Sequence, residues 1–194
     1  MPTTRLEAFS DGVIAIIITI MVLEFDVPEG ADWHSLSALA PHFLTYLLSF
    51  VILAIYWNNH HHLMHATQHV GGGVLWANMH LLFWLSLVPF ATAWMGENHF
   101  AAIPTGAYGV PLLMAAVAYW ILVRAIVAHE GPHSKLRAAL GSDVKGKLSI
   151  AIYVVAIALA FVHESISHAL YVAVALIWFV PDRRIEKSVE VRSG

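Results

Sequence analysis

The 194-residue sequence contains no cysteine, so disulfide bonds and thiol chemistry are excluded. Charged residues are also scarce: they make up 12% of the chain, about half the share typical of soluble domains, whereas hydrophobic residues make up 59%. The formal net charge of -3 is too small to indicate nucleic acid as a partner. Phosphate-binding loops and a G-x-S-x-G motif are missing as well, so we expect neither an enzyme nor a bound cofactor.

Long uncharged runs take the place of charge. A helix that crosses a lipid bilayer needs about 20 mostly apolar residues, and six segments approach that description: residues 13–25, 41–57, 74–95, 106–128, 148–162 and 169–180. Pro89 predicts a kink near the end of the third segment, and the short stretch 163–168 predicts a helical hairpin of the fifth and sixth. We therefore predict an all-α, polytopic membrane protein with six transmembrane helices in residues 1–182 and a basic tail at 183–194.

The Lys and Arg residues are sorted to one side of this layout. They precede the first segment, lie around the connection between the fourth and fifth, or follow the sixth: Arg5; Arg124, Lys135, Arg137, Lys145 and Lys147; Arg183, Arg184, Lys187 and Arg192. The connections after the first, third and fifth segments carry acidic residues instead, among them Asp32, Glu97 and Glu164. Because basic loops stay in the cytoplasm, we expect both termini there and a multi-pass location in the cell membrane.

Asp11 is a carboxylate near the start of the first apolar segment. If the helix begins near Leu6, Ser10 and Asp11 lie inside it. An ionisable group at that depth is costly, so it should face protein or water and have a partner. Two interpretations stay open: a polar network or helix cap that locks helices together, or a site for an ion or a relayed proton.

The first segment also carries one stripe at helical spacing, which consists of Gly12, Ile16, Thr19, Ile20 and Leu23. Thr19 is the one polar side chain in the middle of this run. From periodicity alone, such a stripe is more often a seam where helices pack than the lining of a pore.

Histidines are concentrated after the second segment, at His60, His61, His62, His65 and His69. On a helix, His61, His65 and His69 would share one face, a geometry that can bind zinc. The alternatives are histidines that cap the helix end or pair with a carboxylate such as Asp11, an inhibitory or pH-sensitive metal site, and a catalytic metal site. A further histidine, His80, lies inside the third segment, where a polar group needs a partner and can find one across helices.

The motif Arg5-xxx-Phe9-Ser10-Asp11-Gly12, followed by an Ile-rich helix, resembles the start of the transmembrane protein 175 family of potassium channels. The stretch Tyr56-Trp57-xx-His60-His61 is similar to the aromatic and histidine residues that end the second helix of that family. The six-segment layout fits one family unit, as in its prokaryotic members. The last three segments match only by hydropathy.

The resemblance implies a passive, potassium-preferring cation channel that assembles as a homotetramer in the lipid bilayer. Four first helices would surround a central pore, and ions would pass hydrophobic constrictions in place of a carbonyl filter. The narrowest position falls on Ile16, and the next pore-facing positions fall on Thr19, Ile20 and Leu23, against the packing seam that periodicity favours. A structural network would hold the first helix in place, with Trp76 or Trp84 as a further partner: Arg5, Phe9, Ser10, Asp11 and His61.

Potassium and other monovalent cations are then the expected permeant ions. Rings of Ile side chains narrow enough to exclude water would close the path by dewetting. The alternative function is a proton-linked secondary transporter that uses Asp11 and the histidines. A transporter of that kind would show saturable, coupled flux, which a channel does not.

Overall fold

The computed structural model describes residues 2–131, 136 and 143–179, which are helices joined by short connections without a strand. The predicted basic tail at 183–194 lies outside these described residues. The helices are α1 (Thr3–Leu23), α2 (Trp33–Ser37), α3 (Ala40–Ala66), α4 (Gly72–Ser86), α5 (Val88–Glu97), α6 (Ala102–Glu130), α8 (Val144–Leu159) and α9 (Glu164–Phe179). The predicted all-α class is confirmed for this part of the chain.

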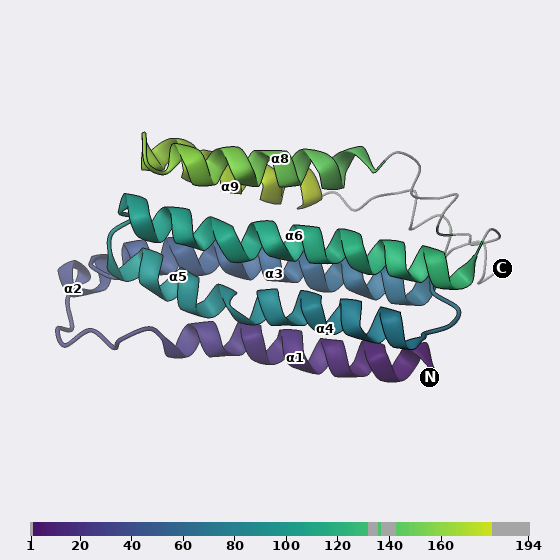
Figure 1. Ribbon diagram of the computed structural model, residues 1–194. Helices are drawn as coiled ribbons and strands as arrows, with labels where there is room; N and C mark the ends of the chain where they lie inside the picture. The colour runs from purple at the N-terminus through teal and green to yellow at the C-terminus, as the bar shows by residue number, and fades with distance from the viewer. Residues whose placement is uncertain (1, 132–135, 137–142, 180–194) are drawn as a thin grey trace.

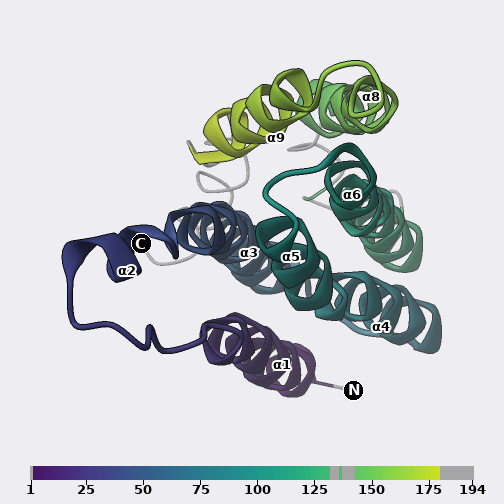
Figure 2. The ribbon, with the colours of Figure 1, turned by 90° about the vertical axis from the view of Figure 1, so that its left-hand side faces the viewer.

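The long helices run side by side along a common direction (Figure 1). Seen end-on, α3, α5 and α4 form a middle row, with α1 on one side and α6 and the α8–α9 hairpin on the other (Figure 2). The core is an apolar cluster that includes Ile14 of α1, Leu53 of α3, Leu85 of α4 and Leu112 of α6. As a result, α1 packs against the bundle along one side only.

Four helical stretches are long and apolar enough to cross a membrane: Thr3–Leu23, Ala40–Ala66, Gly72–Glu97 and Ala102–Glu130. Helices α8 and α9 are shorter, with 16 residues each in the described chain. Their hairpin is confirmed, with the turn before Glu164. The structure therefore supports a membrane protein with at least these four candidate spans.

Proline marks two of the helix boundaries, and one of them, at Pro89, lies where the sequence predicts a kink. Pro41 lies in the first turn of α3, where its missing N–H is not needed. Pro89 cannot donate a backbone hydrogen bond to the preceding turn, so the third segment breaks at Leu87 into α4 and α5. The second segment is longer than predicted, because no proline or glycine interrupts it before α3 ends at Ala66. This extension places the first histidines of the cluster on the helix.

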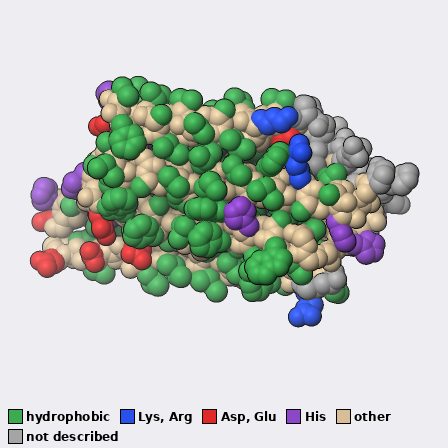
Figure 3. Space-filling view, viewed as in Figure 1, with side chains coloured by type: hydrophobic (Ala, Val, Ile, Leu, Met, Phe, Trp, Pro, Cys, Tyr) green, Lys and Arg blue, Asp and Glu red, His purple; other side chains and the backbone are tan. Residues whose placement is uncertain are grey.

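The connection from α1 to α3 carries the short helix α2, which Asp32 caps. Its carboxylate accepts the backbone N–H of Ser35 at 2.7 Å, and this bond holds the pKa of Asp32 below its usual range. Most acidic side chains on the visible face gather at this end of the molecule, and Lys and Arg side chains lie at the opposite end (Figure 3). The sorting of charge seen in the sequence is thus a sorting along the helix axes.

Gly109 lets α6 approach the hairpin closely, and Gly109→Ala is expected to destabilise the fold. An added Cβ would collide with the Tyr171 hydroxyl and lie 2.5 Å from Cγ1 of Ile157. Overpacking of this kind costs about 1–3 kcal/mol of unfolding free energy. Thermal unfolding of the detergent-solubilised protein measures it, with Gly73→Ala in α4 as the control, since a Cβ there meets open space. Equal unfolding temperatures for the two variants would contradict the packing argument.

Candidate functional site

Helix α1 has an inner face and an outer face. The inner face is buried against the bundle and consists of Leu6, Ser10, Ile14, Ile17 and Met21. The stripe singled out in the sequence lies on the outer face, where all of its members are exposed: Gly12, Ile16, Thr19, Ile20 and Leu23. The interpretation of this stripe as a packing seam within the chain is therefore wrong, because the neighbouring face fills that role.

The outer face is apolar and uncovered in the single chain. The side chain of Ile16 is 59% exposed and that of Leu23 is 79% exposed. The face continues into a groove between α1 and α5, which we call the α1–α5 groove, lined by residues that include Ile16, Ile20, Phe90 and Trp94. In a membrane protein, such a face must meet lipid, another subunit or a narrow pore.

Thr19 is the polar member of the outer face. Its hydroxyl lies 3.0 Å from the backbone carbonyl oxygens of both Ala15 and Ile16, to which it can donate its proton. Because the proton is used inside the helix, the lone pairs of Oγ1 remain available outside it. A ring of such oxygens can replace part of the hydration shell of a cation.

A buried polar chain joins α1 to α3 and α4. Ser10 donates to the carbonyl oxygen of Leu6 at 2.8 Å and accepts from Nδ2 of Asn78 at 2.9 Å. Oδ1 of Asn78 in turn lies 2.7 Å from Nε2 of His60. Ser10, Asn78 and His60 are fully buried, so these bonds fix the rotation of α1 about its own axis. The sequence placed Ser10 in a network, but Asn78 was missed, although an amide inside an apolar helix signals a partner.

A second set of polar contacts lies on the same turns of α1, on residues next to the inner face. Asp11 accepts from the indole N–H of Trp57 at 3.0 Å. One turn earlier, Glu7 lies 2.9 Å from Nδ1 of His61 and 3.1 Å from Nδ1 of His65. These contacts run between α1 and α3 in matching steps of four residues, so the two helices are held together over two turns.

The partners that the sequence suggested for this network need correction. His61 pairs with Glu7, because Asp11 lies one turn further along α1 and meets Trp57. Trp76, which the sequence suggested as a partner, is 78% exposed and makes no described hydrogen bond with α1. Trp84 donates to His80 at 2.8 Å within the same helix, so Trp84 is not a partner of α1 and the described partner of His80 lies on its own helix.

Three other residues of the predicted sites lie away from these contacts. Arg5 and Phe9 are exposed, because they point away from the inner face that carries Ser10. His69 is exposed in the connection after Ala66, where α3 has already ended. The group that could hold a metal ion therefore consists of Glu7, His61 and His65, and His69 is not part of it.

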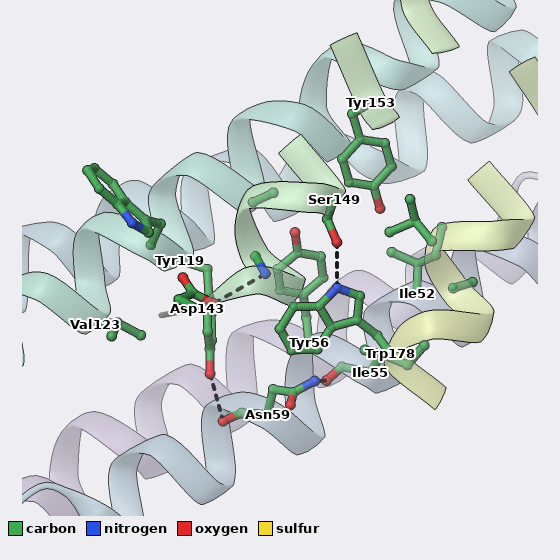
Figure 4. Close-up of a pocket in the computed structure, with 15 residues that line it drawn as sticks. Ile52, Ile55, Tyr56, Asn59, Tyr119, Val123, Asp143, Ser149, Tyr153 and Trp178 are labelled. Atoms are coloured by element: carbon green, nitrogen blue, oxygen red, sulfur yellow. Dashed lines mark hydrogen bonds between the residues drawn. The ribbon is translucent and has the colours of Figure 1, made fainter. Parts of the chain in front are cut away.

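An apolar cavity of about 60 Å³ lies between α3, α6, α8 and α9 (Figure 4). The hairpin of α8 and α9 is on the opposite side of the bundle from α1 (Figure 2). Two of the polar groups on its wall bond to protein: Tyr119 donates to the carbonyl oxygen of Asn59 at 3.2 Å, and Trp178 donates to Ser149 at 2.7 Å. Asp143 accepts the backbone N–H of Gly146 at 3.2 Å. Because the wall is mostly apolar and its carboxylate is already bonded, we take the outer face of α1 as the better candidate for an ion path.

Known proteins resemble this chain in sequence. The family described as the endosomal/lysosomal potassium channel TMEM175 matches residues 5–89, which include α1 from its third residue onward and all of α3. A potassium channel from a Chryseobacterium species is 55% identical over 98% of this chain and 99% of its own length. A potassium channel of Streptomyces collinus is 30% identical over 89% of each chain.

A solved structure shares the fold as well. The crystal structure of a lysosomal potassium-selective channel TMEM175 homolog from Chamaesiphon minutus superposes with a TM-score of 0.82 and 28% sequence identity. The match covers 93% of this chain and 97% of that one. The arrangement of all the long helices, not α1 alone, is therefore shared.

Proposed function

This chain belongs to the TMEM175 family of potassium channels, and on that premise we propose that it conducts potassium passively across the cell membrane. The observation that supports the proposal most directly is the outer face of α1. It is uncharged, apolar and uncovered in the single chain, with one threonine hydroxyl at its centre. A face of this kind suits the wall of a narrow pore that several chains share.

We place six crossings in each chain, with both termini in the cytoplasm. Four helices meet the length of a span by themselves. Helices α8 and α9, at 16 residues each, are about 24 Å long against a hydrocarbon core of about 30 Å. Flanking residues and local thinning of the bilayer would complete these two crossings. The gathering of Lys and Arg at one end of the bundle supports the orientation (Figure 3).

We propose that the conducting unit is a homotetramer. The outer face of α1 is uncovered in the single chain, and one helix alone cannot enclose an ion path. Four copies of the outer face would enclose one, and the apolar α1–α5 groove offers each copy a surface on which a neighbouring subunit can pack. Gly12 fits this arrangement, since nothing in the single chain lies within 4 Å of a Cβ placed there.

The proposed path is controlled by hydration. Rings of Ile16 and Ile20 narrow enough to exclude water would block ions by dewetting, and a small widening would let water and ions in. Between them, a ring of Thr19 oxygens would replace part of the hydration shell. Potassium gives up water more readily than sodium, so a tight, weakly polar ring favours potassium. Acidic residues such as Asp32 and Glu97, at the end of the bundle where α2 lies, would concentrate cations at that mouth of the pore.

The placement of Asp11 favours a channel over a proton-linked transporter. Asp11 of α1 and His61 of α3 lie between these two helices, where they bond to Trp57 and Glu7 respectively, and they do not belong to the exposed stripe. A carrier that moves protons through these groups needs them to alternate between two aqueous sides. A channel needs them only to hold α1 in place.

The test is ion flux in liposomes that contain the purified protein. We expect an outward potassium gradient to drive cation flux that does not saturate with potassium and carries no fixed ratio of protons. A potential-sensitive dye reports potassium movement and an internal pH dye reports protons, with valinomycin as the positive control and protein-free liposomes as the blank. Flux absent from folded protein, or coupled to protons at a fixed stoichiometry, would overturn the proposal.

A further inference from the structure

Three metal-ligating side chains converge at the end of the bundle where α1 begins and α3 ends. Oε1 of Glu7 lies 2.9 Å from Nδ1 of His61 and 3.1 Å from Nδ1 of His65. All three ligand atoms lie within 4.8 Å of one another. The carboxylate is 15% exposed and the imidazoles are 38% and 46% exposed. The group is therefore held by the protein on one side and open to water on the other.

From this geometry we propose that Glu7, His61 and His65 bind a divalent transition metal ion of the zinc class. Zinc bonds to nitrogen and oxygen at about 2.0–2.1 Å in a tetrahedron, whose edges are then about 3.3 Å. The two Glu7 distances differ from that edge by only a few tenths of an ångström, so small side-chain shifts would admit the ion. Two histidines and one glutamate are a donor set that zinc accepts, with water in the fourth position.

The ligands are held in position before any metal arrives. His61 and His65 are one turn apart on α3, and their ring centroids lie 4.2 Å apart. Trp57 stacks on the other side of His61, at 6.1 Å between centroids, and its indole is itself anchored on Asp11. Little side-chain order would have to be gained on binding, which favours affinity.

The donor set also selects the kind of ion. Mg²⁺ and Ca²⁺ prefer six or more oxygen ligands, and Mg²⁺ gives up its water reluctantly. Two imidazole nitrogens are poor ligands for either ion, whereas they suit zinc and its transition-metal neighbours. One of these nitrogens, Nδ1 of His65, also faces the carbonyl oxygen of His61 at 3.2 Å. A bound zinc ion would draw that imidazole toward Glu7 and away from the backbone.

A metal ion at this place would join α1 directly to α3. Glu7 belongs to α1, which carries the proposed pore face, and both histidines belong to α3. Opening by rotation or displacement of α1 would then have to break a metal–ligand bond. We therefore expect zinc to lower potassium flux. This second step rests on the proposed function, whereas the binding step does not.

Binding is tested by calorimetric titration of the full-length, detergent-solubilised protein with zinc chloride. We expect about one zinc per chain, and a loss of affinity of about tenfold or more in Glu7→Gln and in His61→Ala. His62→Ala and His69→Ala are matched controls, since both histidines lie close by in sequence and outside the group. His65→Cys should retain zinc through its thiolate, which separates loss of a ligand from loss of fold. Unchanged affinity in Glu7→Gln and His61→Ala, or no binding to the unaltered chain, would overturn the site.

The effect on conduction is measured separately, in proteoliposomes with zinc on both sides. We expect zinc to reduce potassium flux through the unaltered chain and to leave flux through His65→Ala unchanged. Zinc binding to a chain that never conducts would support the site and reject the channel. Zinc binding to a conducting chain whose flux does not change would overturn the proposed link between the site and α1.

Discussion

Ile16→Asn is expected to increase ion flux several-fold and to weaken the preference for potassium over sodium. In the proposed tetramer, each subunit places one Ile16 side chain at the narrowest point, and four asparagines there would supply eight hydrogen-bonding groups to water. A constriction that closes by excluding water would then stay hydrated. Hydrated ions would pass without giving up water, so the difference between potassium and sodium would shrink. Reversal potentials under potassium and sodium gradients measure this change.

The control for Ile16→Asn is Ile103→Asn. Ile103 belongs to α6 and is 63% exposed, close to the 59% of Ile16. The same polar group is thus added at a similar exposure, but away from the outer face of α1. We expect Ile103→Asn to leave flux and selectivity unchanged. If the two variants behave alike, Ile16 does not line the path, whatever the size of the effect.

Much of the fold follows from the sequence because a bilayer leaves a chain few choices. Every backbone polar group in the hydrocarbon must be paired internally, so long uncharged runs become helices. Pro89 breaks the third run because its ring nitrogen carries no proton. The end of α3 was predicted too early, since histidines near an interface resemble the end of an apolar run while the helix continues to Ala66.

The site was less predictable, for a physical reason. The side chains of α1 are apolar on almost every side of the helix. The spacing of apolar residues alone therefore cannot tell the face that packs from the face that stays uncovered. The choice is made by Ser10, whose partner Asn78 lies 68 positions away in the sequence. Likewise, Glu7 joins the histidines only because α1 and α3 lie side by side, and His69 leaves the group only because the helix has ended.

Asn78→Leu is expected to destabilise the protein by about 2–4 kcal/mol of unfolding free energy. Leucine has nearly the same shape, but it removes the bonds to Ser10 and His60, and interhelical bonds of this kind are worth roughly 0.6 kcal/mol each. The larger cost falls on His60, which is fully buried. Its Nδ1 already lacks a hydrogen-bond partner among the residues that the structure describes, so the variant would leave both ring nitrogens unpaired, at about 1–3 kcal/mol. Thermal unfolding in detergent measures the loss.

A double variant tests whether the unpaired His60 is the cause. Replacing both partners by apolar residues removes the buried polar groups together, so His60→Phe with Asn78→Leu should be more stable than Asn78→Leu alone. If the double variant is the less stable of the two, the unpaired ring nitrogens of His60 are not the cause of the lost stability. The same bonds set the rotation of α1 and therefore which residues form its outer face. Asn78→Leu should accordingly reduce potassium selectivity in the fraction that stays folded, although Asn78 itself is buried behind α1 and does not contact the path.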